Sequence, residues 1–416
     1  MTEVAAPRAE RPSAPRPQSF AARFDPTRNA MALLRIVLAS LVIVSHAYPL
    51  SGRLVDPIGG VTQARESFGT LAVDCFFALS GYLVTGSYVR LRSPLRYAWH
   101  RCLRLFPGFW ALLTTTAFVL GPIGWLVLHH SPRGYLSDGP YGADSAVGYI
   151  GRNVSLVFRQ ADLRGLGDST TFGGAFNGSL WTLRYEFLCY IGLGLLGVLR
   201  LLRWRFVIAA VFLASWTGLL VQERFPSVTL PERLANDHEL LRLGTYFLAG
   251  AMIHAFGRHV RVHPVLAAAA AAALVYALPH RWFQPVGVLV LPYLVFCAAV
   301  WIPVHRADRR GDLSYGIYLY GYAVQQVLAL AHLDRAPLVV YIGLALAWAG
   351  VFAAMSWLGV EEPAMQLRSA RREGGRWLTG GRATFTASDR WWLLRAAGIG
   401  AVVSMVATLA AHVVWV

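Results

Sequence analysis

The sequence predicts an all-α polytopic membrane protein: a ten-helix transmembrane core, an additional C-terminal transmembrane helix and a cytoplasmic N-terminus. Three observations support this fold class. Of the 416 residues, 56% are hydrophobic and only 14% are charged, whereas about 25% are charged in soluble domains. Apolar runs of bilayer-spanning length recur from end to end. Arginines gather in alternate connecting segments, as they do where charge sets the orientation of membrane helices.

The chain divides into four predicted parts. Residues 1–28 are rich in Ala, Pro and Arg and lack an apolar core, which indicates a disordered cytoplasmic tail rather than a signal peptide. The transmembrane domain is expected at 29–363. A basic cytoplasmic linker at 364–390 then leads to the additional transmembrane helix at 391–416.

Eleven spans follow from the apolar runs, and a polar loop at 129–177, with a short interfacial helix near 145–158, separates the third from the fourth. The spans are predicted at 30–50, 68–89, 105–128, 178–199, 206–221, 240–257, 264–279, 283–303, 312–332, 337–359 and 391–415.

Charge supports this arrangement. All 38 basic residues are arginine, and with the N-terminus inside, the six inside segments contain 24 of them, whereas the outside loops contain 10. The positive-inside rule predicts such a bias. The net charge of +16 is therefore assigned to topology rather than to nucleic acid. The four cysteines form no pattern, so we expect buried thiols, with neither a disulfide nor a metal site.

The first span, "LRIVLASLVIVSH", contains two polar residues, Arg35 and His46. Eleven residues make three helical turns plus about 20°, so both side chains face the same way, roughly 16 Å apart along the axis. They are expected to line one internal groove, with the arginine in the cytoplasmic half. The alternatives are an arginine that snorkels to the headgroups and a histidine satisfied within the bundle.

The second span contains "VDCFFALSGYL" and runs antiparallel to the first. Asp74 is therefore expected near the depth of His46, where a carboxylate can fix the tautomer of the imidazole. A structural ion pair is the alternative. Ser80 and Gly81 permit close approach of another helix.

The inside loop "HRCLRLFP" places Arg101 and Arg104 on one helix face. Paired guanidiniums there suit a polyphosphate, although ordinary topological charge would look the same. In the fourth span, "NGSLWTLRYEFLCY", a helix would place Glu186 too deep for solvent, so it is expected to be protonated or paired, with Arg184 and Arg242 as candidate partners. A purely structural ion pair is the alternative.

The ninth span begins with "DLSYGIYLYGY". Tyr315, Tyr318 and Tyr322 fall at i, i+3 and i+7 and form a stripe of hydroxyls, for which an aromatic belt or packing is the alternative. The tenth span ends at "EEP", Glu361–Pro363, which first indicates a helix stop.

Together these stretches resemble the acyltransferase-3 family of integral membrane O-acyltransferases over about residues 28–363. The matching motifs are the Arg and His eleven apart, Asp-x-Phe-Phe-x-x-Ser-Gly (Asp74 to Gly81), the double arginine before Pro107, Ser-Leu-Trp-Thr-Leu-x-x-Glu (Ser179 to Glu186), Ser-Tyr-Gly-x-Tyr-Leu (Ser314 to Leu319) and Glu-x-Pro. Two departures are Tyr82, where the family usually has Phe, and the eleventh helix. In fused members that helix leads to an esterase-like domain, which is not expected here because the chain ends at Val416.

The resemblance implies transfer of an acyl group, usually acetyl, from cytoplasmic acyl-CoA to a hydroxyl of an extracytoplasmic or lipid-linked carbohydrate. We expect the protein in the plasma membrane and expect no metal cofactor. His46 is then a general base or is itself acylated. The predicted catalytic residues are His46, Asp74 and Glu186, and the predicted donor-binding residues are Arg35, Arg101, Arg104, Ser314, Tyr315 and Tyr318.

Two other classes of protein stay open at this point. Charged residues within a membrane also suit a transporter or flippase, but the chain has no paired inverted halves. A non-catalytic assembly subunit would need none of these polar groups. Release of CoA from acyl-CoA in the presence of an acceptor distinguishes the enzyme from both.

Overall fold

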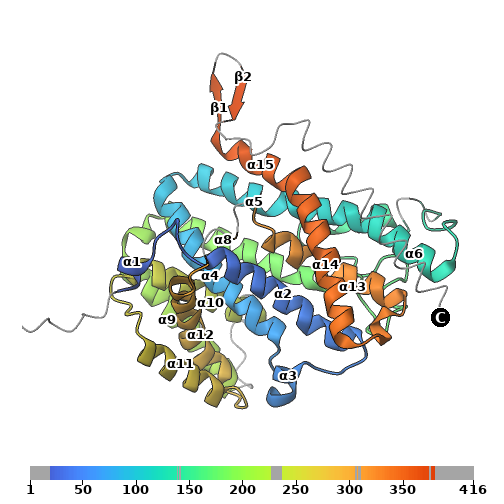
Figure 1. Cartoon of the computed structure of the whole chain (residues 1–416). Helices are drawn as coiled ribbons and strands as arrows, with labels where there is room; N and C mark the ends of the chain where they lie inside the picture. The colour runs from blue at the N-terminus through green and yellow to red at the C-terminus, as the bar shows by residue number, and fades with distance from the viewer. Residues whose placement is uncertain are drawn as a thin grey trace, which may run out of the picture.

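The computed structural model describes residues 19–137, 139, 142–225, 237–304, 307, 311–373 and 376–379, which form a helical bundle and one short hairpin (Figure 1). The long helices are α2 (Met31–Leu50), α4 (Phe68–Leu91), α5 (Pro94–Thr115), α6 (Gly121–His129), α8 (Trp181–Val198), α9 (Arg205–Arg224), α10 (His238–Phe256), α11 (Pro264–Ala277), α12 (Phe283–Trp301), α13 (Ser314–Leu330) and α14 (Leu338–Ser356).

The shorter elements lie at the ends and in the connections of this bundle. They are α1 (Phe20–Arg23), α3 (Pro57–Thr62), α7 (Ala146–Asn153), α15 (Glu362–Gln366), 3₁₀ turns at Gly178–Leu180, Leu201–Arg203, Leu333–Arg335 and Leu367–Ser369, π-helical turns at Thr116–Leu120 and Trp357–Glu361, and the antiparallel strands β1 (Ala370–Glu373) and β2 (Arg376–Thr379).

Helices occupy the segments that the sequence predicted between residues 30 and 359, and α7 lies within the predicted interfacial helix. Among the described residues, six continuous helices are long and apolar enough to cross a membrane. The helix of the predicted third span begins earlier than expected, at Pro94, where the side chain of Ser93 caps it by accepting from the N–H of Arg96. It continues through Pro107. The predicted helix at 391–416 lies outside the described residues.

Part of the predicted tail is folded. The structure describes this tail from Ser19 onward, and there Phe20 is only 1% exposed. Its ring packs edge-on against Tyr82 and Phe296, with centroids 5.7 and 5.5 Å away. The backbone N–H of Phe20 donates to Val260. The predicted disorder is therefore wrong for this described segment, because the rings of Phe20 and Phe24 both pack against Tyr82 and anchor it.

Helix α13 lies at the centre of one half of the bundle. Every residue from Ser314 to Leu330 is buried, with α2 and α14 against it. The side chain of Gln325 donates to the carbonyl of Ile43, 2.9 Å away, which ties α13 to α2. This contact places the tyrosine face of α13 beside the helix that carries Arg35 and His46.

Helix α4 crosses α10 at very short range because both helices have a glycine at the contact. A Cβ on Gly81 would lie 1.8 Å from the carbonyl oxygen of Phe247, and a Cβ on Gly250 would lie 1.8 Å from that of Ala78. No other side chain fits at these two positions. The predicted role of Gly81 in close packing is therefore confirmed.

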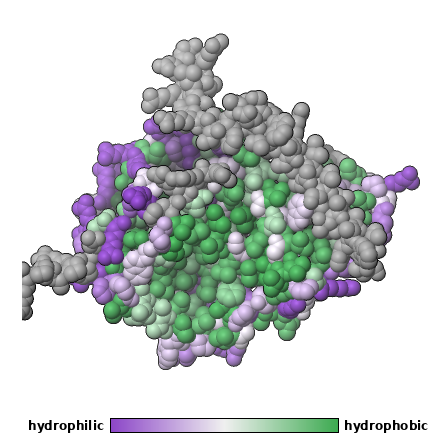
Figure 2. All heavy atoms as spheres, viewed as in Figure 1, coloured by the Kyte–Doolittle hydropathy of each residue, from purple (hydrophilic) through white to green (hydrophobic). Residues whose placement is uncertain are grey.

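The outer surface is strongly apolar. Figure 2 shows a broad hydrophobic face with hydrophilic residues towards its margins, and exposed side chains such as Phe206, Val275 and Val339 belong to α9, α11 and α14. Apolar surface of this extent requires a lipid or protein partner. With the apolar helices, it identifies a multi-pass membrane protein.

Candidate active site

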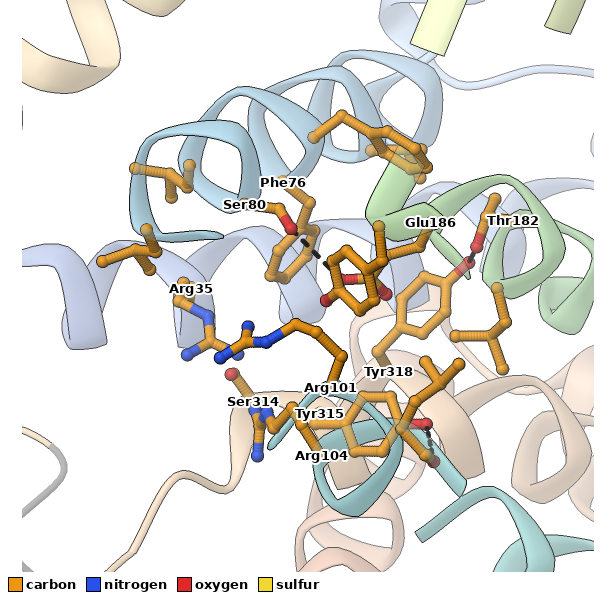
Figure 3. Close-up of a pocket in the computed structure, with 17 residues that line it drawn as sticks. Arg35, Phe76, Ser80, Arg101, Arg104, Thr182, Glu186, Ser314, Tyr315 and Tyr318 are labelled. Atoms are coloured by element: carbon orange, nitrogen blue, oxygen red, sulfur yellow. Dashed lines mark hydrogen bonds between the residues drawn. The ribbon is translucent and has the colours of Figure 1, made fainter. Parts of the chain in front are cut away.

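A cavity of about 120 Å³ lies inside the bundle, between α2, α4, α5, α8 and α13 (Figure 3). We call it the arginine cavity. Figure 3 shows the guanidinium groups of Arg35, Arg101 and Arg104 gathered at one end, and Thr182 with Tyr318 at the other. Its walls contain Glu186 and all six residues that the sequence predicted for donor binding: Arg35, Arg101, Arg104, Ser314, Tyr315 and Tyr318.

A single carboxylate holds two of the arginines. Oδ2 of Asp312, just before α13, accepts from Arg35 at 2.5 Å and from Arg104 at 2.6 Å. The hydroxyl of Ser314 donates to Oδ1 at 2.5 Å. Asp312 therefore fixes both guanidiniums at the mouth of the cavity.

The positive charge of Arg101 is available to a ligand. Its guanidinium lies 5.5 Å from the ring centroid of Tyr190 and makes one long hydrogen bond, of 3.4 Å, to Ser87. Among the described residues it has no carboxylate partner, and its Nε has no hydrogen bond. Arg368 adds a further positive charge that acts on both Arg101 and Arg104. This end of the cavity is consequently suited to an anionic ligand.

Glu361 contributes to the same end, which corrects the expectation of a helix stop at this motif. The helix that begins at Leu338 continues to Gln366 through a π-helical turn. Glu361 is buried, accepts a 2.9 Å hydrogen bond from Ser356 and lies 3.9 Å from Arg104. Pro363 is tolerated because it stands in the first turn of α15.

Glu186 is held by hydroxyls. The phenol of Tyr190, one turn later on α8, donates to its carboxylate, and Ser80 of α4 donates at 3.3 Å. The predicted partners are wrong: Arg242 pairs with Asp74 and Glu239, and Arg184 lies over the ring of Tyr185. Glu186 is thus a cavity carboxylate without an arginine salt bridge among the described residues.

The far end of the cavity is closed by hydroxyl contacts. The phenol of Tyr318 donates to the carbonyl of Ser179 at 2.6 Å and lies 2.5 Å from the hydroxyl of Thr182. Tyr315 donates to the carbonyl of Leu105 at 2.7 Å. These bonds fix two tyrosines of the predicted stripe as cavity walls.

His46 lies beyond this closed end. It does not line the cavity. Its ring packs edge-on against Tyr322, with centroids 5.0 Å apart, and Tyr322 follows Tyr318 by one turn of α13, about 6 Å along the axis. The tyrosine stripe therefore leads from the arginine cavity to the imidazole.

Asp74 does not lie beside His46, which corrects a central expectation. Its Oδ1 accepts from Arg242 at 2.5 Å, and its other oxygen has no hydrogen-bond partner. Asp74 and Gly81 are seven residues apart on one face of α4, the face that meets α10. Val73, Phe76 and Ser80, on another face of α4, line the cavity. The sequence placed Asp74 on this helix, but it could not show which neighbour the face that carries Asp74 meets.

Sequence analysis missed three residues that contribute to the arginine cavity or its charge. Asp312 directly precedes the Ser-Tyr-Gly motif, whose Ser314 and Tyr315 were predicted to bind the donor together with the arginines. This proximity in the sequence could have indicated that Asp312 pairs with those arginines. Tyr190 stands four residues after Glu186, which is hydrogen-bonding distance on a helix. Arg368 follows the closing Glu-x-Pro motif and gave no such signal. In the part of the chain that the structure describes, no cluster of three His, Cys, Asp or Glu side chains could bind a metal ion.

The fold and this cavity define the class of the protein as a multi-pass membrane protein built around an internal polar site. Comparison with known proteins then gives the family. Residues 28–357 match the family described as "Acyltransferase domain", and the chain belongs to this acyltransferase-3 family. The family assignment establishes an acyltransferase.

Two curated proteins are similar. The "O-acetyl transferase" of Shigella phage Sf6 is 30% identical over 313 residues, which are 72% of this chain and 85% of that protein. "Nodulation protein 10" of Rhizobium leguminosarum bv. viciae is 28% identical over 375 residues, 82% of this chain and 95% of that protein. No solved structure matches significantly.

Proposed function

We propose that this protein transfers an acyl group, acetyl in the first instance, from cytoplasmic acyl-CoA to a hydroxyl of an extracytoplasmic or lipid-linked carbohydrate. The observation that supports this most directly is the arginine cavity. Among the described residues Arg101 has no carboxylate partner there, so its charge is available to the phosphates of a donor. The similar phage protein is named an O-acetyl transferase, which supports acetyl as the group and a hydroxyl as the acceptor.

The donor would bind with its phosphates at the arginine end. Arg101 would contact them directly, while Arg35 and Arg104, already fixed by Asp312, would add charge at the mouth. The narrow pantetheine arm would extend along Ser314, Tyr315 and Tyr318. The contact between Tyr318 and Thr182, which closes the far end of the cavity, would have to open so that the thioester can reach Tyr322 and His46.

The chemistry assigned to His46 is proton transfer. Its free ring nitrogen takes the proton of the acceptor hydroxyl while that oxygen attacks the thioester carbon. The C–S bond then breaks, and the protonated imidazole returns the proton to the CoA sulfur. The route through an acyl-histidine is a variant of the same proposal and is distinguished by trapping labelled protein without acceptor.

Glu186 and Asp74 receive different roles in this proposal. The Glu186 carboxylate stands in the cavity wall with Ser80 and Tyr190, so we assign it to positioning the pantetheine arm of the donor. Asp74 is assigned to structure, because its carboxylate is engaged by Arg242.

The topology proposed is eleven spans in the plasma membrane with the N-terminus inside. It rests on the bias of arginines towards the inside segments. It would place the arginine cavity open to cytoplasmic acyl-CoA and the start of α4 at the outer face.

The test uses membrane vesicles from cells that express the protein, supplied with radiolabelled acetyl-CoA. We expect free CoA thiol and alkali-labile label in the glycan and glycolipid fraction, because an ester is formed. His46→Gln should reduce both by about 10²–10⁴-fold, the range for a lost general base. His259→Gln, at an exposed histidine, is the matched control and should retain activity.

The outcomes separate the rival functions. A transporter or flippase would move its substrate without releasing CoA, so binding of acetyl-CoA with no thiol release would contradict the enzyme. Normal transfer by His46→Gln would remove His46 from the mechanism while leaving the acyltransferase intact.

A further inference from the structure

A second cavity, of about 280 Å³, lies at the start of α4. Its walls come from the loop before α4, the end of α9 and the first turns of α10 and α12, and include Glu66, Glu223, Glu239, Arg242 and Gln284. None of its lining residues belongs to the arginine cavity, so the proposed donor site leaves it unexplained.

The floor of the second cavity is buried and held in place by hydrogen bonds. Arg242 donates to Asp74 at 2.5 Å and to Glu239 at 2.6 Å. The amide of Gln284 donates to Glu66 at 2.6 Å, and the other oxygen of Glu66 accepts from Thr70 at 3.0 Å. These polar groups are therefore preorganised rather than free to rotate.

One acceptor in this floor is unsatisfied. Gln284 is 4% exposed, and its Oε1 has no hydrogen-bond partner. The orientation of the amide is fixed, because its nitrogen donates to Glu66. A buried acceptor without a donor is costly, so this position calls for a ligand that brings a hydrogen-bond donor into the cavity.

The charge of the second cavity selects the kind of ligand. Its walls contain three arginines (Arg65, Arg242 and Arg281) and three glutamates (Glu66, Glu223 and Glu239), so the formal charges cancel. An anionic donor gains nothing here, in contrast to the arginine cavity. An uncharged ligand with adjacent hydroxyls, each able to donate and to accept, matches this mixture of donors and acceptors.

Aromatic surface adjoins the rim of the second cavity, where His280 is a lining residue. His280 lines the cavity and packs against Tyr276 and Trp282, with ring centroids 5.1 and 5.2 Å away. Tyr276 is 65% exposed and Trp282 is 41% exposed. Such amphipathic rings provide flat apolar area beside polar groups, which suits the C–H face of a pyranose ring.

The second cavity is also close to the proposed base. A Cβ on Gly69 would lie 3.1 Å from Oγ of Ser45, the residue before His46, while the next residue along α4, Thr70, lines the cavity. The first turn of α4 therefore separates His46 from the cavity. A chain of sugar units lying over this turn could reach both.

We propose that the second cavity binds a neutral sugar unit of the carbohydrate acceptor, next to the unit whose hydroxyl is acylated. This inference rests on the proposed function. Gln284 accepts from one sugar hydroxyl, the carboxylates of the cavity accept from others, and the aromatic rim contacts the ring face. The cavity thereby selects the acceptor without contacting the reacting atoms.

The experiment measures sugar binding directly. Purified full-length protein in lipid nanodiscs is titrated with glucose, galactose, mannose, rhamnose and N-acetylglucosamine, and saturation-transfer NMR reports contact. At least one sugar should bind, and acetyl-CoA should not displace it. Gln284→Met keeps the side-chain length but removes the acceptor, and should weaken binding about tenfold. Gln63→Met, exposed and outside the cavity, should bind normally.

Arg281→Ala provides a second variant that does not disturb the buried floor, because Arg281 is exposed at the rim; it should weaken binding as well. Absence of binding for all five sugars, or wild-type binding by both Gln284→Met and Arg281→Ala, would overturn the inference. Sugar binding without acyl transfer would refute only the proposed function. Transfer without any effect of Gln284→Met on the KM of the acceptor would refute only this inference.

Discussion

The two cavities contain arginines and carboxylates in different proportions. The arginine cavity is lined by three arginines and one carboxylate, Glu186, and Asp312 just behind the mouth serves two of the arginines at once. In the second cavity, arginines and glutamates are equal in number, and Arg242 is saturated by Asp74 and Glu239.

The difference teaches that an arginine within a membrane bundle is not a ligand site by itself. Arg242 is 3% exposed and completes an ion pair, so it stabilises the contact between α4 and α10. Arg101 has no such partner among the described residues, so its charge can serve a ligand. The number of carboxylates around each guanidinium distinguishes the two roles, and substitutions can test the role assigned to each arginine.

The largest expected effect is on stability, from Arg242→Met. It would leave Asp74, which is fully buried, and Glu239 without their cation. Breaking a buried pair from one side costs roughly 3–5 kcal/mol. We expect a strongly lowered melting temperature in detergent. Adding Asp74→Asn to this variant should recover part of the loss, and a wild-type melting temperature for Arg242→Met alone would contradict the structural role.

The next effect is on donor binding, from Arg101→Gln. A hydrogen bond to a charged group contributes about 1.5–3 kcal/mol, so the Kd for acetyl-CoA should rise roughly 10- to 150-fold, at an unchanged melting temperature. A pantetheine thioester, which lacks the adenosine phosphates, should bind almost as before. Arg203→Gln, at an exposed arginine, is the control. Equal losses for both donors would show that Arg101 does not bind phosphate.

Much of this arrangement could be predicted because helical periodicity fixes which residues share a face. Arg101 and Arg104 at i, i+3, and Tyr315 and Tyr318 at i, i+3, all line one cavity. The apolar runs likewise placed the helices, because spanning length and hydropathy are local properties of the sequence.

The errors concern which neighbour each face meets, because that depends on packing between distant segments. Asp74 was expected beside His46 from its depth alone, but the glycine contact at Gly81 turns its face towards α10. Glu361 was expected to end a helix, and a π-helical turn carries it into the bundle instead. Neither the crossing of α4 with α10 nor that turn can be derived from spacing along one chain.

A moderate effect follows from Asp74→Asn. The amide preserves shape and one acceptor, and Arg242 keeps Glu239, so we expect a modestly lowered melting temperature with nearly normal turnover. The test is turnover across pH 6–9 beside thermal melting. If Asp74 instead oriented His46, turnover would fall by up to about 10⁴ at a normal melting temperature. That result would contradict the purely structural role given to the pair of Asp74 and Arg242.

The smallest effect is expected for Tyr318→Phe, at the closed end of the arginine cavity. The change removes the hydroxyl that donates to Ser179 and pairs with Thr182, and each such bond contributes about 1 kcal/mol. Tyr320→Phe is the matched control on α13, because its phenol makes a long hydrogen bond, of 3.5 Å, to Thr115 and its ring stacks on Phe352. Tyr318→Phe should therefore lower the melting temperature more than Tyr320→Phe does.

Because the hydroxyl of Tyr318 lies on the proposed path of the donor but bears no charge, the Kd of the Tyr318→Phe variant for acetyl-CoA should change by less than about threefold. A loss of donor binding as large as that of Arg101→Gln would place a charged part of the donor at this end, and the assignment of phosphates to the arginine end would then be reversed.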